Sequence, residues 1–407
     1  MHNSRTGYRS LDVGFMWLNH LSLRVFGISL RDDEHYLYKL YALFIFIISM
    51  SSPIGGLITI SENLSSPTII AENLAIGGAL FIGTVKFLSM LYIRKDFVKH
   101  MNQLNNGIFI QHERNKDETE KRIVENGWFH VKCLFFIYHM FPTMYIVFAN
   151  TPVLLKRHFS IGNGSEWFLP FGGFPAFDTE KSPNFEIALI YQNISNYSTY
   201  IIYSTYHCMV VTVMIYLNVQ CLLLQNVIKT CIERCRRRAL RNGKNLSIVR
   251  WCYLKDEVKA IVRYHDAIID ISKKFSDDLA FTTLIDFFGM SVILANGIFY
   301  SFTINQLNFR TIQILTLASS TIVTEFVMSY WSSEFVFNFL KIGHVCYEID
   351  FIDTDIKFQK ALNLLILRSQ KPVEFTVGNF SSLNMETFIT ILKGAYSCFM
   401  VLHHSEV

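Results

Sequence analysis

The chain has 407 residues and a formal net charge of +4, so the sequence gives no sign of a nucleic-acid partner. Hydrophobic residues make up 51% of the sequence and charged residues only 17%, against roughly 25% charged residues in soluble proteins. This composition excludes disordered, collagen-like and coiled-coil chains and disfavours a soluble enzyme. It favours a single membrane domain over residues 1–407.

Residues 1–39 form a predicted cytoplasmic N-terminal segment. Within it, residues 14–30 are apolar but carry His20 and Arg24, and no cleavage site typical of a signal peptide follows. This stretch predicts an amphipathic helix that lies on the membrane surface, with Trp17 at the interface.

Seven stretches are long and apolar enough to cross a bilayer, which takes about 20 residues in a helix. They span residues 40–61, 73–93, 133–155, 187–228, 287–309, 311–340 and 385–402. The fourth is about twice the length that a bilayer needs. Either it contains a loop, or its helix continues into the cytoplasm and packs against other protein, which is the alternative we favour. The predicted fold class is therefore all-α, a bundle of seven transmembrane helices.

The 37 Lys and Arg residues set the orientation of this bundle. Most of them lie in the N-terminal segment and in the loops after the second, fourth and sixth spans, which the positive-inside rule assigns to the cytoplasm. We therefore expect a cytoplasmic N-terminus, an extracellular C-terminus, and cytoplasmic segments over 229–286 and 341–371. G-protein-coupled receptors have the opposite orientation, and their Asp-Arg-Tyr and Asn-Pro-x-x-Tyr motifs are absent.

The sequence lacks the motifs of soluble enzymes, namely a phosphate-binding loop, a His-Glu-x-x-His zinc motif and a nucleophile elbow. The eight cysteines contain no CxxC pair and fall outside the predicted extracellular stretches, which indicates reduced thiols rather than disulfides or a zinc site. We expect no enzymatic activity, no cofactor and no metal. Asp286 and the ionisable residues of the later spans are scattered over different helices, without the pattern of an intramembrane catalyst.

Ionisable residues inside spans are costly and usually face protein or water. Lys86, Glu325 and Lys393 are therefore candidates for a wet cavity or an ion path. For Lys86 and Glu334 the favoured interpretation is a boundary charge that reaches the membrane interface. Lys393 lies near the middle of the last span, where that explanation is harder to apply.

Aromatic side chains crowd the outer halves of the third and fourth spans. Small-molecule pockets are mostly apolar and aromatic, but interface belts also collect Tyr and Trp. For any single residue the belt is the favoured interpretation.

A series of short motifs occupies the C-terminal third of the chain. They are Tyr330-Trp331-Ser332-Ser333-Glu334, Lys357-Phe358-Gln359-Lys360, Leu367-Arg368-Ser369-Gln370-Lys371-Pro372, Met385-Glu386-Thr387-Phe388, Ile391-Leu392-Lys393 and Tyr396-Ser397 with Phe399. In this order, and with seven spans and an internal N-terminus, the series resembles the insect odorant receptor family. Ser333 departs from the Gly that is commoner there in that family.

The resemblance implies an odorant-gated, non-selective cation channel in the plasma membrane, in the dendrites of olfactory sensory neurons. Its implied partners are a volatile odorant, a co-receptor subunit within a heterotetramer, permeating cations and membrane lipid. The cytoplasmic segments would form an anchor region. This chain resembles the ligand-tuning subunit rather than the co-receptor.

The resemblance also places the ligand in the outer halves of spans two, three, four and six. Residues at that depth are Ile76, Leu80, Phe81, His139, Met144, Phe148, Tyr197, Tyr200, Ser204, Leu315 and Ser319. The last helix would line the pore, with Val401 as a hydrophobic gate and His404 facing passing ions one turn further out.

Other functions stay open at this point. A gustatory receptor of the same superfamily is the nearest alternative, although Ala395-Tyr396-Ser397 favours the odorant branch. A transporter or a metabotropic seven-span receptor is a more distant one.

Overall fold

The computed structural model describes residues 15–31, 34–105, 109, 118–159, 169–171, 181–241, 248–304 and 308–404. The helices in these ranges are α2 (Trp17–Val25), α3 (Tyr36–Glu62), α4 (Pro67–Asn105), α5 (Glu118–Phe159), α6 (Asn184–Arg241), α7 (Trp251–Ile304), α8 (Phe309–Glu348), α9 (Ile356–Ser369) and α10 (Met385–His404). One short hairpin, β1 (Thr376–Val377) and β2 (Ser381–Ser382), precedes α10. The predicted all-α class is confirmed.

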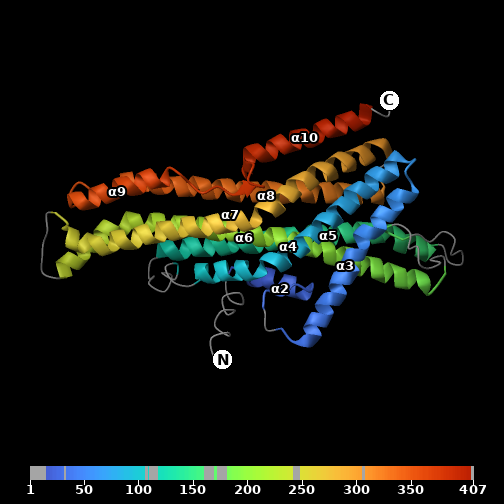
Figure 1. Ribbon diagram of the computed structural model, residues 1–407, viewed down its shortest axis with the longest axis horizontal. Helices are drawn as coiled ribbons and strands as arrows, with labels where there is room; N and C mark the ends of the chain where they lie inside the picture. Colours follow the sequence, from blue (N-terminus) through green and yellow to red (C-terminus); the bar gives the residue numbers. More distant parts are fainter. Residues whose placement is uncertain are drawn as a thin grey trace.

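Within the described residues six helices, α3 to α8, are long and apolar enough to cross a membrane. Most of them extend well beyond the predicted spans, because the polar residues that flank the apolar stretches continue the helices. Figure 1 shows an elongated bundle in which α6, α7 and α8 run together toward the end where α9 lies. A separate 20-residue helix, α10, covers the seventh predicted span, and its crossing of the membrane stays a prediction.

Helix α6 is the central element of the bundle. It is one continuous helix of 58 residues, so the long fourth apolar stretch contains no loop. Residues 198–221 are buried without interruption, because α3, α4, α5, α7 and α8 all pack around them. A helix that is surrounded by protein has no need of a polar face, which explains its apolar composition.

The N-terminal helix α2 packs one face against the bundle, where Asn19, His20 and Leu23 are buried, while Trp17 on its other face is exposed. The Asn19 amide donates a hydrogen bond to Thr212 Oγ1 of α6 at 3.0 Å. Polar side chains that bond across helices therefore hold α2 against the bundle, a contact that amphipathicity alone does not predict. Its position at the membrane surface stays a prediction.

The β1–β2 hairpin lies between α9 and α10 in the sequence and packs against α7. The backbone N–H of Gly378 donates to the carbonyl oxygen of Ala280 on α7 at 2.9 Å. Gly378 has a φ of +58°, a conformation that side chains disfavour, and a Cβ there would lie 2.8 Å from Leu284. Helix α10 then runs along the outside of the bundle and packs mainly against α7 (Figure 1).

The end of the bundle that carries α9 is also tightly packed. Phe358, Leu362 and Leu365 form the buried face of α9 against α8 and α7. His265 of α7 lies against this face, with its Nε2 3.2 Å from Ser369 Oγ. His265 precedes the predicted span over residues 287–309, and burial of its imidazole lowers the pKa of His265 to about 4.

Candidate functional site

A small cavity lies between α4, α5, α6 and α8. Its lining residues are Ala79, Tyr138, Phe141, Pro142, Tyr145, Tyr200, Tyr203, Ser204, Leu317, Ser320, Thr321 and Thr324. The cavity measures about 20 Å³, which is room for roughly one water molecule. Aromatic walls with a few polar groups are typical of small-molecule sites.

Helical spacing explains why these side chains meet. On α6, Tyr200, Tyr203 and Ser204 lie three and four residues apart and so share one face. On α8, Leu317 and Thr321 show the same spacing. Each helix therefore brings several consecutive turns to the same cavity.

The hydroxyl groups that α8 contributes are already engaged within that helix. Ser320 Oγ and Thr321 Oγ1 donate to the carbonyl oxygen of Leu317 at 2.7 and 2.9 Å. Thr324 Oγ1 donates to the carbonyl oxygen of Ser320. These oxygens are left free to accept hydrogen bonds, and the other walls combine apolar and aromatic surface with the hydroxyl groups of Ser204 and of the tyrosines.

A second, larger cavity lies between the N-terminal ends of α4 and α8 and the C-terminal end of α5 and measures about 590 Å³. Its lining includes Arg310, whose Nε donates to Glu72 Oε1 at 2.7 Å and whose Nη1 donates to the Gln313 side chain at 2.7 Å. The ring of Tyr145, in the wall of the small cavity, stacks on that of Phe171, in the wall of the large one, at 5.9 Å. These two rings lie between the cavities.

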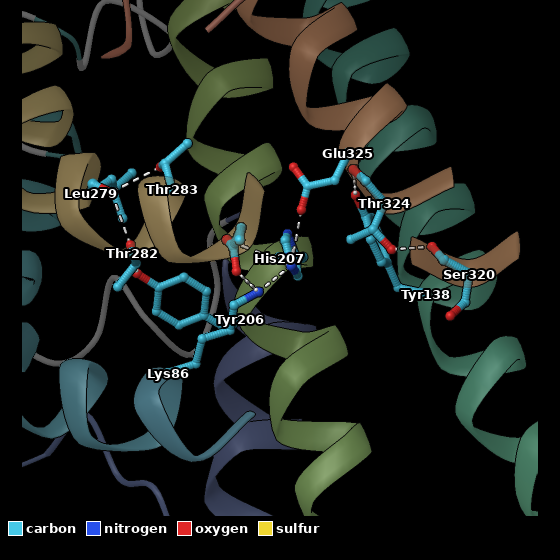
Figure 2. A network of polar contacts seen from close by, with 11 residues as sticks. Lys86, Tyr138, Tyr206, His207, Leu279, Thr282, Thr283, Ser320, Thr324 and Glu325 are labelled. Atoms are coloured by element: carbon cyan, nitrogen blue, oxygen red, sulfur yellow. Dashed lines mark hydrogen bonds and ion pairs between the residues drawn. The ribbon is translucent and has the colours of Figure 1, made fainter. Parts of the chain in front are cut away.

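A cluster of four ionisable side chains lies next to the small cavity. Lys86 of α4, His207 of α6, Asp286 of α7 and Glu325 of α8 are each no more than 3% exposed. Lys86 Nζ is 2.8 Å from Asp286 Oδ1 and also contacts His207 Nε2. His207 Nε2 is 3.8 Å from Asp286 Oδ2 and 3.9 Å from Glu325 Oε1. Figure 2 shows Lys86 and Glu325 reaching His207 from different sides.

The ion cluster and the small cavity share two tyrosines. Lys86 Nζ lies 3.9 Å from the centre of the Tyr203 ring, a cation–π contact. The His207 ring stacks parallel to Tyr138 at 6.4 Å. Tyr138 and Tyr203 both line the cavity, so a molecule in it would rest on side chains that contact the cluster.

Residues around the cluster fix it further. Tyr206, which is next to His207 in the sequence, forms a hydrogen bond with Thr282 Oγ1 of α7 at 2.8 Å (Figure 2). Tyr138 of α5 donates to the carbonyl oxygen of Thr324 on α8 at 3.4 Å. Five helices therefore hold the cluster through polar contacts.

Five of the residues chosen from the sequence lie at or beside the cavities. Tyr200 and Ser204 line the small cavity, and Phe148 lines the large one. Ile76 and Leu80 are buried in the apolar cluster that surrounds the small cavity.

Two others take part in different contacts. His139 Nε2 lies 3.0 Å from Ser22 Oγ and 3.2 Å from Thr205 Oγ1, so it helps to hold α2. Tyr197 packs edge-on against Phe26 at 5.9 Å.

The remaining four lie on the outside of the bundle. Phe81, Met144, Leu315 and Ser319 are exposed. These residues were chosen by depth in the membrane, but consecutive helix positions are about 100° apart. Depth alone therefore does not identify the face that looks inward, and on α8 that face carries Leu317 and Thr321 instead.

On α10, Lys393 and Val401 are both exposed, and Val401 is 70% exposed. The side chain of His404 lies outside the described residues. The roles of Val401 and His404 in a pore stay predictions.

The boundary interpretation of Lys86 is wrong, because this side chain is 1% exposed and pairs with Asp286. The expectation that the intramembrane charges are scattered is also wrong. Folding brings Lys86, Asp286 and Glu325, which come from three different helices, together around His207. Sequence reasoning missed His207. The available signal was that it is the only histidine in the 42-residue apolar stretch 187–228.

Known proteins resemble this chain in both sequence and fold. The family model described as 7tm Odorant receptor matches residues 66–396. Odorant receptor 30a of Drosophila melanogaster is 27% identical over 242 residues, and Odorant receptor 10 of Aedes albopictus is 24% identical over 236 residues. These matches cover 59% and 58% of this chain and 60% of each relative.

Among solved structures, the insect olfactory receptor OR5 from Machilis hrabei in complex with eugenol is similar over 96% of this chain and 98% of that one. Its TM-score is 0.76 and the sequence identity is 14%, so the likeness shows the fold.

Proposed function

The chain belongs to the 7tm odorant receptor family, and from that premise we propose that it is the ligand-tuning subunit of an insect odorant receptor. In this proposal a volatile molecule binds in the small cavity between α4, α5, α6 and α8 and opens a non-selective cation channel. The observation that carries the proposal is an aromatic cavity, lined by four tyrosines, inside the membrane bundle.

Two further features support this assignment. The cavity walls combine aromatic rings with hydroxyl groups, those of the four tyrosines among them, which suits a small, mostly apolar ligand that carries a polar group. The OR5 structure, which has the same fold, was solved with eugenol, a small aromatic molecule.

The proposed assembly is a heterotetramer with a co-receptor subunit in the dendritic membrane of olfactory neurons. Helix α10 lies on the outside of the bundle with Val401 exposed, as a helix that faces a central pore and other subunits would. The proposed gate is a ring formed at Val401, and the proposed permeant species are monovalent and divalent cations.

The test is expression with a co-receptor in oocytes, a panel of volatiles and voltage clamp. We expect a rapid, odorant-dependent cation current that needs no G protein. A response that requires G-protein signalling, or substrate transport without channel current, would contradict the channel assignment.

The same assay tests the location of the ligand. Tyr200→Ala and Ser204→Ala should change odorant rank order. The tyrosine variant should shift the half-maximal concentration about tenfold, since a fully buried large apolar side chain is worth about 2 kcal/mol and only the part that faces the ligand is felt. Phe81→Ala and Leu315→Ala are the controls, because both residues are exposed on the outside of the same helices that line the cavity. Changed preference in the controls alone would place the ligand elsewhere.

A further inference from the structure

The ion cluster contains more negative than positive groups. Lys86 supplies one ammonium group, while Asp286 and Glu325 supply two carboxylates, and all three side chains lie inside the bundle. Lys86 is in contact with Asp286 at 2.8 Å, so these two charges offset each other. The Glu325 carboxylate is left over, and an uncompensated buried carboxylate is strongly unfavourable.

Glu325 also lacks hydrogen-bond partners among the described residues. Neither of its carboxylate oxygens accepts a hydrogen bond there, although the residue is 0% exposed. Its carboxylate Oε1 lies 3.9 Å from His207 Nε2. That separation is too long for a direct hydrogen bond.

Protonation of His207 is not a favourable way to neutralise the extra negative charge of Glu325. An imidazolium ion has two N–H donors, and His207 Nδ1 faces no acceptor within the part of the chain that the structure describes. His207 Nε2 also contacts the Lys86 ammonium, which disfavours a second positive charge at the ring. The imidazole is therefore neutral, its Nε2 lone pair is directed at the Lys86 ammonium, and it does not offset the surplus carboxylate.

The three donor groups converge on one point. One donor atom each from His207, Asp286 and Glu325 lie within 4.8 Å of one another, and they come from α6, α7 and α8. We propose that the Asp286 and Glu325 carboxylates bind one small monovalent cation beside His207, with Na⁺ as the reference ion. One positive charge neutralises the cluster, a hard cation prefers carboxylate oxygens, and a divalent ion would leave a surplus of positive charge.

The cation site adjoins the odorant cavity, and this step rests on the proposed function. Tyr138 stacks on His207 and Tyr203 lies under Lys86, while both tyrosines line the cavity. An odorant that displaces these rings changes the cation site, and by linkage the cation changes the affinity for the odorant.

The test of the cation site uses purified full-length protein without odorant. Thermal unfolding is followed while NaCl replaces the chloride salt of a large organic cation, at constant ionic strength and pH and with a chelator of divalent ions present. We expect the melting temperature to rise by about 2 °C for each tenfold increase of Na⁺ above its dissociation constant. Glu325→Gln removes the surplus charge with little change of shape, and its melting temperature should not respond to Na⁺.

Glu334→Gln on the same helix is the matched control. Glu334 is partly exposed and its Oε1 already accepts from Asn338 Nδ2 at 2.9 Å, so this variant should keep the full response to Na⁺. Equal responses in the wild type and in Glu325→Gln would overturn the proposal. So would a wild-type melting temperature that ignores Na⁺ but depends on pH through Glu325, because the carboxyl group would then simply be protonated. Since no odorant is present, either result leaves the proposed receptor function to its own test.

Discussion

Removal of the Lys86 ammonium is the sharpest perturbation that the structure offers. Lys86→Met keeps most of the side-chain volume but leaves two carboxylates, Asp286 and Glu325, against a neutral imidazole. The side chains of Lys86 and Asp286 are 1% and 2% exposed, so water cannot compensate for the lost charge. Breaking a buried ion pair in this way costs about 3–5 kcal/mol, which corresponds to a melting temperature about 5 °C lower for a chain of this length.

A double variant distinguishes the loss of charge from the loss of packing. Lys86→Met combined with Asp286→Asn has the same net charge at the cluster as the wild type, so it should recover most of the lost stability. Thermal unfolding of purified protein measures all four combinations as a double-mutant cycle. A double variant that is no more stable than Lys86→Met would refute the charge-pair explanation and leave packing of the lysine stem as the cause.

Three more predictions concern the ends of the molecule. Tags stained without permeabilising cells should be visible at the C-terminus and not at the N-terminus; the reverse pattern would contradict the assigned orientation. Val401→Ala should raise the odorant-free leak and His404→Glu should change relative cation permeability, whereas wild-type leak and reversal potentials at normal surface expression would remove both residues from the pore. Because the pKa of His265 is lowered to about 4 by burial, the folded state binds fewer protons than the unfolded state, and stability should fall as pH drops from 7 toward 4. At pH 5.5 the loss is about 1 kcal/mol relative to pH 7.5, a shift of about 2 °C or less, and it should disappear in His265→Gln; a loss unchanged in that variant would assign it to other groups.

The architecture was predictable because it depends on quantities that the sequence contains directly. Apolar stretches with few charges become long helices, since every backbone polar group in a bilayer must be satisfied within the helix. The excess length of the fourth stretch indicated the long α6 for the same reason. These features need no knowledge of how the helices are rotated.

The site was less predictable because rotation and partner choice decide it. Of the residues that the sequence proposes for the pocket, Tyr200 and Ser204 line the small cavity, whereas Leu315 and Ser319 lie on the exposed face of α8. Lys86 was interpreted as a boundary charge because its partner, Asp286, is 200 residues away in the sequence. A single sequence does not reveal such a pair, and helix packing alone brings it together.

The size of the small cavity has a consequence for how a ligand would act. Its volume is about 20 Å³, whereas an apolar cavity that binds benzene measures about 150 Å³. In the proposed binding mode an odorant in this cavity acts as a wedge that separates helices already in contact, and the occupied receptor would be a different packing of the same bundle. A compound that fitted both packings equally well would open nothing, however tightly it bound. Potency and efficacy should consequently vary independently along a series of ligands of increasing bulk.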